Sequence, residues 1–393
     1  MLFEPGRIGS LTVPNRIIRT AVSETMATRS GQVTDELVSL YAGLARGGVA
    51  LMFTGQMFCE ERGRFGFAQT AIHHDGLLAG LRRLTDAVHR AGGAVFAQLA
   101  HAGNQSLARG LPLVAPSAAS NAMTGQRAPA AEEADIAEVI EAFGQAAMRA
   151  VEGGFDGVHL HGANGYLISS FMSPLSNTRT DRWGGSALAR GELALAIVRR
   201  VREAVPDLYP VTMKLGVIDE MSGGLTLEES LPRARALVTA GVDAIEVSSN
   251  LATSYSFSAR EYAGVTRRQA AGDLLVHRLL ARERPEAYFR PLAGALSAML
   301  PVPVILTGGL RRRSVMESVL RSGDAGFVGL GRPFIREPDL IKRLRRERAG
   351  PAECTSCNIC AMHDEYHSLR CWRDPRRNLA EHAFFRLKGG FRP

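Results

Sequence analysis

Lysine and long apolar runs are scarce in this 393-residue chain, and each scarcity narrows the class of protein it can be. Three lysines, Lys214, Lys342 and Lys388, stand among 47 basic residues, so the net charge of +8 comes from an arginine bias typical of genome composition rather than nucleic-acid recognition. No segment reaches the ~18 apolar residues that a membrane helix needs. The first residues contain an acid, a proline and a glycine where a signal peptide needs an unbroken apolar stretch. We expect a cytoplasmic protein that binds neither nucleic acid nor membrane.

Two nucleotide-binding signatures are also missing from the sequence. No G-x-G-x-x-G follows a candidate strand and no G-x-x-x-x-G-K-[ST] occurs, so neither a dinucleotide-binding Rossmann unit nor a P-loop is indicated. Glycine (41 residues) and proline (18 residues) occur at ordinary frequencies, and 46% of the residues are hydrophobic. This composition excludes disorder as the main state and allows a large buried core.

Short apolar segments alternate with helical patterns along most of the chain. Eight segments have the non-alternating apolar pattern of buried parallel strands: 16–21, 49–54, 94–99, 157–160, 210–215, 244–247, 302–306 and 326–329. The clearest helical periodicity covers 135–153 and stops at two glycines. Eight strand–helix units predict an α/β fold, a closed (β/α)8 TIM barrel. We place this barrel at residues 1–350 and a short, basic, cysteine-containing C-terminal tail at 351–393.

Two connections are longer than such a barrel requires. They cover about 105–133 and about 248–287, and the second contains Tyr255 and Tyr262. Long loops in compact domains are often lids or pocket walls, so these tyrosines either line a pocket or simply pack.

Polar residues and glycines follow the candidate strands, which is where a TIM barrel carries its active site. These candidate site residues are Ser23, Gly55, Gln98, His161, Asn164, Lys214, Gly308, Gly309, Gly331 and Arg332. The glycines after the seventh and eighth strands let the backbone approach a ligand closely, at the usual phosphate site of this fold. A phosphorylated ligand is therefore expected, and glycines that only make tight turns are the alternative.

The segment after the fourth strand brings three reactive side chains together. His161 and Asn164 are hydrogen-bond donors that can hold an oxygen as it gains negative charge, and Tyr166 can give up a proton. A purely structural histidine is the alternative. Lys214 lies in an apolar strand, where a lone cation is costly unless paired, and a ligand anion or a carboxylate would serve equally.

One long string in the sequence is specific enough to indicate a family. Residues 161–186 read HGANGYLISSFMSPLSNTRTDRWGGS, and residues 14–23, 97–103 and 328–334 add supporting pieces. The sequence resembles the Old Yellow Enzyme family of FMN-dependent ene-reductases, particularly the branch of 2,4-dienoyl-CoA reductase and trimethylamine dehydrogenase. The resemblance runs from Phe3 to about Asp374.

The resemblance implies an FMN site with a role for each candidate residue. Ser23 would contact the flavin O4 edge, Gly55 would offer backbone to the ring, and Gln98 would bond the pyrimidine edge. Lys214 stands where the family has arginine, beside N1 and O2, and would keep the charge without the two-pronged geometry. The phosphate would be held by Gly308, Gly309, Gly331 and Arg332.

The resemblance also implies a reaction. NAD(P)H would reduce FMN, and the reduced flavin would reduce the C=C bond of an α,β-unsaturated carbonyl compound, an enone or an enoyl thioester. His161 and Asn164 would bind the carbonyl oxygen and Tyr166 would protonate the α-carbon. The loop of Asn177, Arg179, Asp181, Gly184 and Gly185 is interpreted as a hydrogen-bonded wall of the barrel mouth.

Other functions stay open from the sequence alone. A flavin-dependent amine dehydrogenase or demethylase is one, although His161 with Asn164 counts against it, and a flavoprotein subunit with an electron-transfer partner is another. Outside redox chemistry, a barrel lyase would use Lys214 for a Schiff base. A homo-oligomer is compatible with all of them.

Four of the five cysteines crowd into the tail as Cys354-x2-Cys357-x2-Cys360-x10-Cys371. Thiolates at this spacing suit a 4Fe-4S cluster or a tetrahedral zinc ion, and a metal-free thiol cluster is the third interpretation. The spacing resembles the cluster ligands of the multidomain branch, in which electrons pass on to a C-terminal domain. The 22 residues after Cys371 are too few for such a domain. Cys59 is expected to be an ordinary buried thiol.

Overall fold

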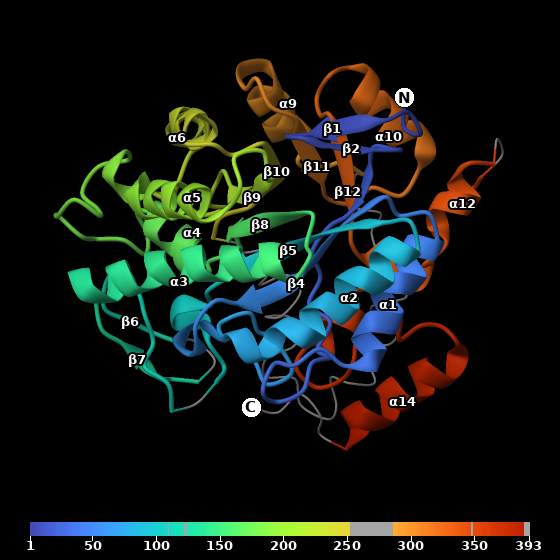
Figure 1. Ribbon diagram of the computed structural model, residues 1–393, viewed down its shortest axis with the longest axis horizontal. Helices are drawn as coiled ribbons and strands as arrows, with labels where there is room; N and C mark the ends of the chain where they lie inside the picture. Colours follow the sequence, from blue (N-terminus) through green and yellow to red (C-terminus); the bar gives the residue numbers. More distant parts are fainter. Residues whose placement is uncertain (109, 122–123, 252–285, 347–348, 389–393) are drawn as a thin grey trace.

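Eight parallel strands close into a barrel in the computed structural model, which describes residues 1–108, 110–121, 124–251, 286–346 and 349–388 (Figure 1). The barrel strands are β3 (Ile17–Arg19), β4 (Leu51–Phe58), β5 (Ala94–Ala100), β8 (Gly157–Gly162), β9 (Val211–Gly216), β10 (Ala244–Ser248), β11 (Val304–Thr307) and β12 (Phe327–Leu330). Their order around the barrel is their order in the chain. The predicted TIM barrel is confirmed, and each of the eight expected strands overlaps one of these strands.

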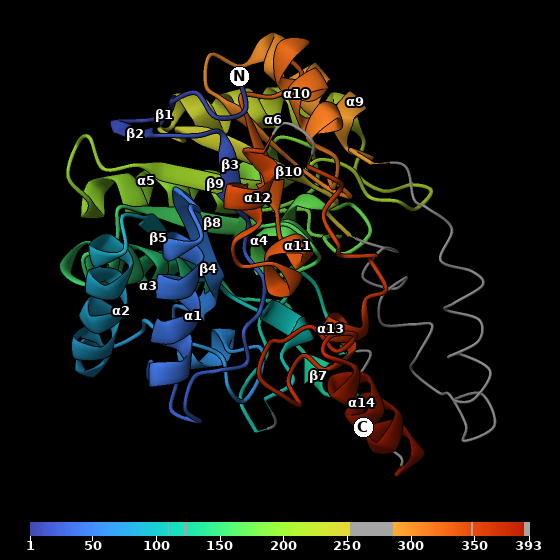
Figure 2. The same cartoon turned by 90° about the vertical axis from the view of Figure 1, so that its right-hand side faces the viewer.

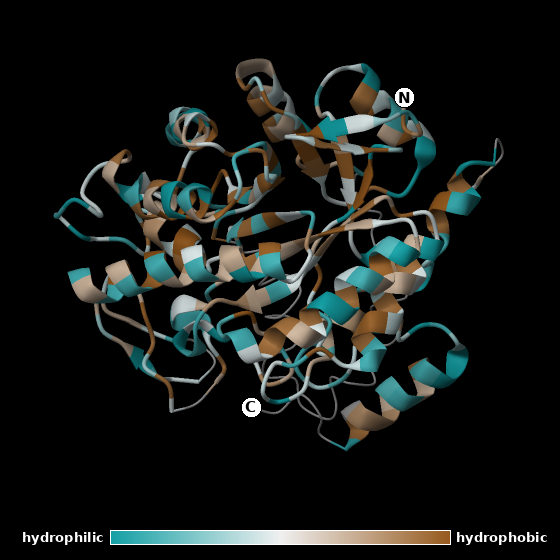
Figure 3. Cartoon of the chain, in the orientation of Figure 1, coloured by the Kyte–Doolittle hydropathy of each residue, from teal (hydrophilic) through white to brown (hydrophobic). Residues whose placement is uncertain are grey.

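Helices cover the outside of the barrel and continue into the C-terminal tail (Figure 1). Those of the barrel are α1 (Asp35–Arg46), α2 (Leu78–Arg90), α3 (Glu133–Glu152), α4 (Leu167–Met172), α5 (Glu192–Ala204), α6 (Leu227–Thr239), α9 (Arg290–Met299), α10 (Arg313–Arg321), α11 (Arg332–Arg336) and α12 (Leu340–Leu344). The tail adds α13 (Ile359–Met362) and α14 (Arg376–Leu387). Bands of hydrophobic and hydrophilic residues alternate along the outer helices, as expected for helices with one buried face (Figure 3).

Helix α3 shows why the predicted helix forms where it does. Its buried stripe includes Ile136, Val139 and Phe143, which repeat at helical spacing. The helix begins two residues before the expected start because Glu132 and Asp135 form a reciprocal capping box over the first turn. The prediction for this helix is confirmed.

A hairpin that we did not predict from the sequence closes the amino ends of the barrel strands. Strands β1 (Gly6–Ile8) and β2 (Leu11–Val13) pair antiparallel, and Ile8 and Val13 join the apolar cluster inside the barrel. Ser10 Oγ donates to the carbonyl of Leu208, just before β9. A ligand must therefore enter from the other end, where the carboxyl ends of the strands lie.

The structure describes much of the first long connection but little of the second. The first contains a short antiparallel pair, β6 (Ala119–Ser120) and β7 (Arg127–Ala128). Most of the second, including Tyr255 and Tyr262, lies outside the described residues.

The C-terminal tail packs back onto the barrel. The Ala352 amide donates to the Arg311 carbonyl, and the Leu369 amide donates to the carbonyl of Glu24, which follows β3. In both views α14 lies on the side of the molecule opposite the β1–β2 hairpin (Figures 1 and 2). The tail therefore reaches the end of the barrel that the hairpin leaves open.

Candidate active site

Lys214 is part of a row of polar side chains that crosses three neighbouring strands. It pairs in register with His161 on β8 and with Glu246 on β10. Lys214 Nζ lies 3.0 Å from Glu246 Oε1, and the Glu246 side chain is fully buried. The sequence left a ligand anion or a carboxylate as the partner of Lys214. In the structure its partner is the carboxylate of Glu246.

Glu246 also accepts hydrogen bonds from side chains on or directly after other strands. The Thr307 hydroxyl donates to Oε1 at 2.8 Å, and the Thr20 hydroxyl donates to the same oxygen. Burial alone would raise the pKa of Glu246, but the Lys214 ammonium and the His159 hydrogen bond hold it well below its usual 4.5. Glu246 is therefore an anion that keeps the Lys214 ammonium in place.

His159 links this network to the barrel wall. Its Nε2 lies 3.0 Å from Glu246 Oε2, its Nδ1 lies 2.8 Å from the Thr212 hydroxyl, and its ring stacks on Phe53 at 4.0 Å between centroids. Burial lowers the pKa of His159 below 6.5 despite the Glu246 carboxylate. The imidazole is thus a buried, satisfied structural group.

His161, by contrast, has an unused ring nitrogen. Its Nδ1 is buried and has no hydrogen-bond partner in the part of the chain that the structure describes. Burial, reinforced by Lys214, lowers the pKa of His161 well below 6.5, so the ring is neutral. A buried, unpaired nitrogen is costly in the free protein and is typical of a group that meets a ligand.

Asn164 and Tyr166 lie beside His161, as the sequence predicted. Asn164 takes a left-handed backbone conformation with φ of 61°, and its Oδ1 accepts a hydrogen bond from Ser248 at 3.2 Å. The side-chain amide nitrogen of Asn164 therefore remains as a hydrogen-bond donor. The Tyr166 ring lies edge-on to His161 with centroids 4.8 Å apart. The structure therefore places Tyr166 against His161 and holds the Asn164 side chain through Ser248.

Gln98 fits the role expected at a cofactor edge. Its backbone amide donates to the Thr54 hydroxyl at 2.8 Å, which fixes the strand. Its side-chain Nε2 is buried and lacks a partner among the described residues. As at His161, a donor is left for a bound group.

The backbone N–H of Gly55 bonds to protein groups, whereas the resemblance implied that this backbone would contact the flavin ring. Its N–H donates to Glu24 Oε1 at 2.6 Å and to the Tyr41 hydroxyl at 3.0 Å. Arg19 lies 3.5 Å from the same carboxylate oxygen and completes the buried cluster. The N–H of Gly55 is therefore occupied by protein, and a Cβ at this position would overlap the Glu24 carboxylate.

Ser23 meets a residue of the C-terminal tail. The partly buried Asp364 carboxyl forms hydrogen bonds with the hydroxyls of Ser23 and Thr25, the second at 2.8 Å. Burial raises the pKa of Asp364, and burial and the neighbouring Asp364 raise the pKa of Glu365 to about 7. The tail thus supplies an acid beside a predicted flavin contact.

The glycine turn after β11 has a backbone conformation that favours glycine. Gly308 and Gly309 have φ of 126° and 72°, which side chains rarely adopt, and a Cβ on Gly308 would lie 2.8 Å from the Tyr288 ring. Gly331 precedes α11. The Arg332 guanidinium donates to Asn358 Oδ1 of the tail, so this arginine joins the loop to the cysteine segment.

The four tail cysteines lie around one cavity of about 160 Å³. Arg332 and Asn358 line the same cavity. Across the described residues, no three His, Cys, Asp or Glu side chains are grouped to hold a single metal ion. Burial raises the pKa of Cys360 to about 12, so without a bound cation this thiol is protonated. Cys59 is buried elsewhere in the barrel, and burial raises its pKa, as expected for an ordinary buried thiol.

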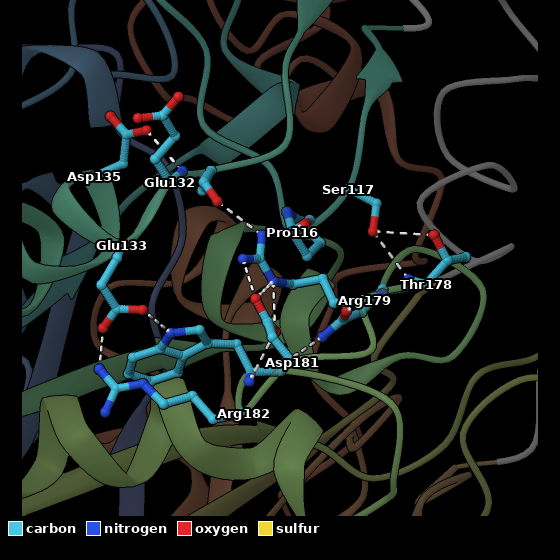
Figure 4. Close-up of polar contacts among 12 residues, drawn as sticks. Pro116, Ser117, Glu132, Glu133, Asp135, Thr178, Arg179, Asp181 and Arg182 are labelled. Atoms are coloured by element: carbon cyan, nitrogen blue, oxygen red, sulfur yellow. Dashed lines mark hydrogen bonds and ion pairs between the residues drawn. The ribbon is translucent and has the colours of Figure 1, made fainter.

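The loop after α4 forms a hydrogen-bonded wall, as interpreted from the sequence (Figure 4). Arg179 is held by Asp181 and donates to the carbonyls of Pro116 and Ala131 at 2.9 and 2.7 Å. Asn177 donates to two backbone carbonyls, those of Phe171 and Trp183. These side chains are satisfied by protein, which agrees with a structural role.

Sequence reasoning missed Glu246, His159, Gln56 and Asp364. Glu246 could have been recognised from the sequence, because it is a single acid between Ile245 and Val247 in an apolar strand. Asp364 gave none, because its position depends on how the tail folds back. No helix among the described residues has the length and apolar character to cross a membrane.

The closed parallel barrel, with its unpaired donors at the carboxyl ends of the strands, defines a (β/α)8-barrel protein with a ligand site at that end. The family model described as NADH:flavin oxidoreductase / NADH oxidase family matches residues 1–350, and the chain belongs to this family.

Two relatives agree with this membership, and a solved structure shares the fold. An NADH oxidase of Thermoanaerobacter brockii is 34% identical over 94% of this chain and 54% of its own length. A 4,4'-dithiodibutanoate disulfide reductase of Rhodococcus erythropolis is 34% identical over 94% of both chains. The structure of a 2-naphthoyl-CoA reductase complex has the same fold, with a TM-score of 0.83 and 24% identity over 97% of this chain and 58% of that one. The chain thus spans about half the length of the Thermoanaerobacter protein.

Proposed function

We propose that this chain binds FMN, accepts hydride from NADH or NADPH, and reduces the C=C bond of α,β-unsaturated carbonyl compounds. The residues present fit the cofactor. Gln98 Nε2 is a buried donor without a protein partner among the described residues, and Gly308 and Gly309 take positive-φ backbone conformations directly after β11. Lys214, ion-paired with Glu246, supplies a fixed positive charge at the barrel centre.

The observation that carries the proposal is the arrangement of His161, Asn164 and Tyr166. When bound, FMN supplies hydride chemistry that no side chain can perform. The neutral His161 ring and the Asn164 amide can both donate to a carbonyl oxygen, which polarises the conjugated alkene and stabilises the oxygen as it becomes enolate-like. Two neutral donors suit an oxygen that begins neutral and gains charge.

Tyr166 completes the chemistry as the proton source. Its ring lies 4.8 Å from that of His161 between centroids, so a carbonyl compound held by its oxygen would present its α-carbon near the phenol. Transfer of the phenol proton to that carbon would complete the reduction.

A second substrate class, organic disulfides, is supported by one comparison. The Rhodococcus disulfide reductase matches this chain over 94% of both lengths. A disulfide has no carbonyl oxygen, so its reduction would not use His161 and Asn164 as donors. The barrel lyase is disfavoured, because Lys214 is held as a paired ammonium rather than as a free amine.

Product analysis separates these functions. The FMN-loaded protein is incubated anaerobically with NADH or NADPH and one of three substrates, a cyclic enone, a dialkyl disulfide or a tertiary amine. We expect saturated ketone, with one reduced nicotinamide consumed for each C=C bond. Free thiol alone would support the disulfide function. In a parallel sample without nicotinamide, oxidation of one amine per FMN, with the bound flavin as the oxidant, would support the dehydrogenase.

We propose that the four tail cysteines hold a 4Fe-4S cluster rather than zinc. They surround one cavity of about 160 Å³, and four thiolates at this spacing suit an iron–sulfur cluster. Arg332 faces the same cavity and would offset the negative charge of bound thiolates. Such a cluster would serve an electron-transfer partner.

A further inference from the structure

Strand β4 carries an irregularity at the point where it reaches the site. Phe53 pairs with Phe96 and Gln56 pairs with Gln98, so β4 contains one residue more than β5 over this stretch. Such a bulge reverses the face to which the following side chains point. Without it, Gln56 would face away from Phe53, which lies in the inner apolar cluster. The bulge therefore turns Gln56 to the inside of the barrel.

Once turned inward, Gln56 contacts the predicted proton donor. Its Nε2 donates to the Tyr166 hydroxyl oxygen at 3.3 Å. The side chain is buried, and its Oε1 is left without a partner among the described residues. A glutamine placed only for stability would be expected to have both ends satisfied.

Neighbouring groups hold Gln56 and Tyr166 at this separation. Gln69 Nε2 donates to the backbone carbonyl of Gln56 at 3.0 Å, and Gln69 Oε1 accepts from the Phe65 amide at 2.6 Å. The Phe65 ring then packs edge-on against Tyr166, with centroids 5.6 Å apart. This series of contacts, from Gln56 through Gln69 and Phe65 to Tyr166, holds the Gln56–Tyr166 hydrogen bond in place.

The chemistry of the proton donor explains why such a contact is useful. When Tyr166 protonates the α-carbon, its O–H bond breaks, a C–H bond forms, and the electron pair remains on the phenol oxygen. A hydrogen bond to this charged form stabilises it, whereas burial without one opposes it. We propose that Gln56 is a positioning residue that donates to Tyr166 and stabilises the phenolate left after proton transfer. This inference rests on the proposed function.

The direct test follows Tyr166 itself rather than turnover. The FMN-loaded protein is labelled with [13Cζ]tyrosine, the Tyr166 resonance is assigned by its loss in Tyr166→Phe, and its titration with pH is recorded by NMR. We expect the titration midpoint to rise by about one pH unit in Gln56→Leu, which removes the donor, and further in Gln56→Glu, which places an anion beside the phenol. Burial keeps the pKa of His161 well below 6.5, so its ring does not change charge in this range.

Gln145→Leu is the matched control, since it makes the same chemical change on the outer helix α3, where the Gln145 side chain donates a solvent-exposed hydrogen bond to Glu141. It should leave the Tyr166 midpoint unchanged. An unchanged midpoint in both Gln56 variants would overturn the inference. Gln56→Glu is nearly isosteric with the native residue and carries the test if Gln56→Leu does not fold.

Half-reactions then separate this inference from the proposed function. In Gln56→Leu, oxidation of the reduced protein by an enone should slow about tenfold, and reduction by NAD(P)H should stay within about twofold. If Tyr166→Phe leaves enone reduction intact, the proton-donor function itself is wrong. If Tyr166→Phe slows the reaction and Gln56→Leu does not, only the role of Gln56 fails.

Discussion

Glu246 shows how a single buried acid organises the interior of this barrel. It fixes the Lys214 ammonium at 3.0 Å and bonds to His159 on a second strand. A carboxylate with this many partners is an anion in the folded chain, and removing it would leave a buried cation unpaired.

Glu246→Gln should therefore destabilise the protein by about 3–5 kcal/mol at pH 7. Because the pKa of Glu246 is held below 4.5 in the folded state, its contribution is present above pH 4.5 and is lost as the pH falls through the lower folded value. Urea unfolding at pH 7 and at pH 4 or below measures the difference, which should shrink at the lower pH.

Glu141→Gln is the control for that measurement. Glu141 is paired with Arg200 on the exposed surface, and that hydrogen-bonded pair lowers its pKa to about 2. Its loss should change stability by less than about 1 kcal/mol, since exposed pairs contribute little. Equal losses for Glu141→Gln and Glu246→Gln would contradict the central position given to Glu246.

Tyr166→Phe tests the proposed proton donor. Alkene reduction should slow by at least about 100-fold, because the proton must then come from water. Flavin reduction by NAD(P)H should change less than about twofold, since the phenol takes no part in it. Stopped-flow measurement of the two half-reactions checks this, and equal slowing of both would show that Tyr166 only shapes the site.

At the scale of elements, the sequence predicted the barrel strands better than the contacts between them. The eight strands were visible because each is a mainly apolar run without the alternation of a strand exposed on one face. The pairs β1–β2 and β6–β7 were not, because strands of three or two residues are too short to show a period. Strand β4 runs to Phe58, beyond the expected end, and the bulge in that extension redirects Gln56.

The candidate site was predictable where it depends on position after a strand, as for His161 and Gln98. It was not predictable where it depends on packing between distant segments. Asp364 reaches Ser23 only because the tail folds back over the open end of the barrel. No local pattern in the sequence encodes that approach.

The proposed cluster in the cysteine segment leads to a separate prediction at this scale. Protein isolated anaerobically should contain about four iron and four sulfide per chain. Cys371→Ser should lose most of both, because one of the four ligands is removed, whereas Cys59→Ala should retain them, because Cys59 is buried away from the tail. Zinc in place of iron, or equal iron in the two variants, would show that the tail does not hold the cluster.

At the scale of the whole molecule, the hairpin and the tail give the barrel two different ends. The β1–β2 hairpin fills the amino end with apolar side chains, and the opposite end keeps buried donors without partners among the described residues. A ligand that bonds these donors would bind the folded chain only and would stabilise it by mass action. FMN at 100 times its dissociation constant should add about 2.7 kcal/mol to the free energy of unfolding. Thermal unfolding with and without FMN measures this, with riboflavin as the control that lacks the phosphate.

The most direct test of the central claim is an anaerobic visible spectrum of the protein after incubation with FMN and removal of the unbound cofactor. The account predicts a flavin spectrum at one FMN per chain, which bleaches when NADH or NADPH is added and returns when an enone is supplied. A protein that retains no FMN, or retains it without bleaching by either nicotinamide, would contradict the account.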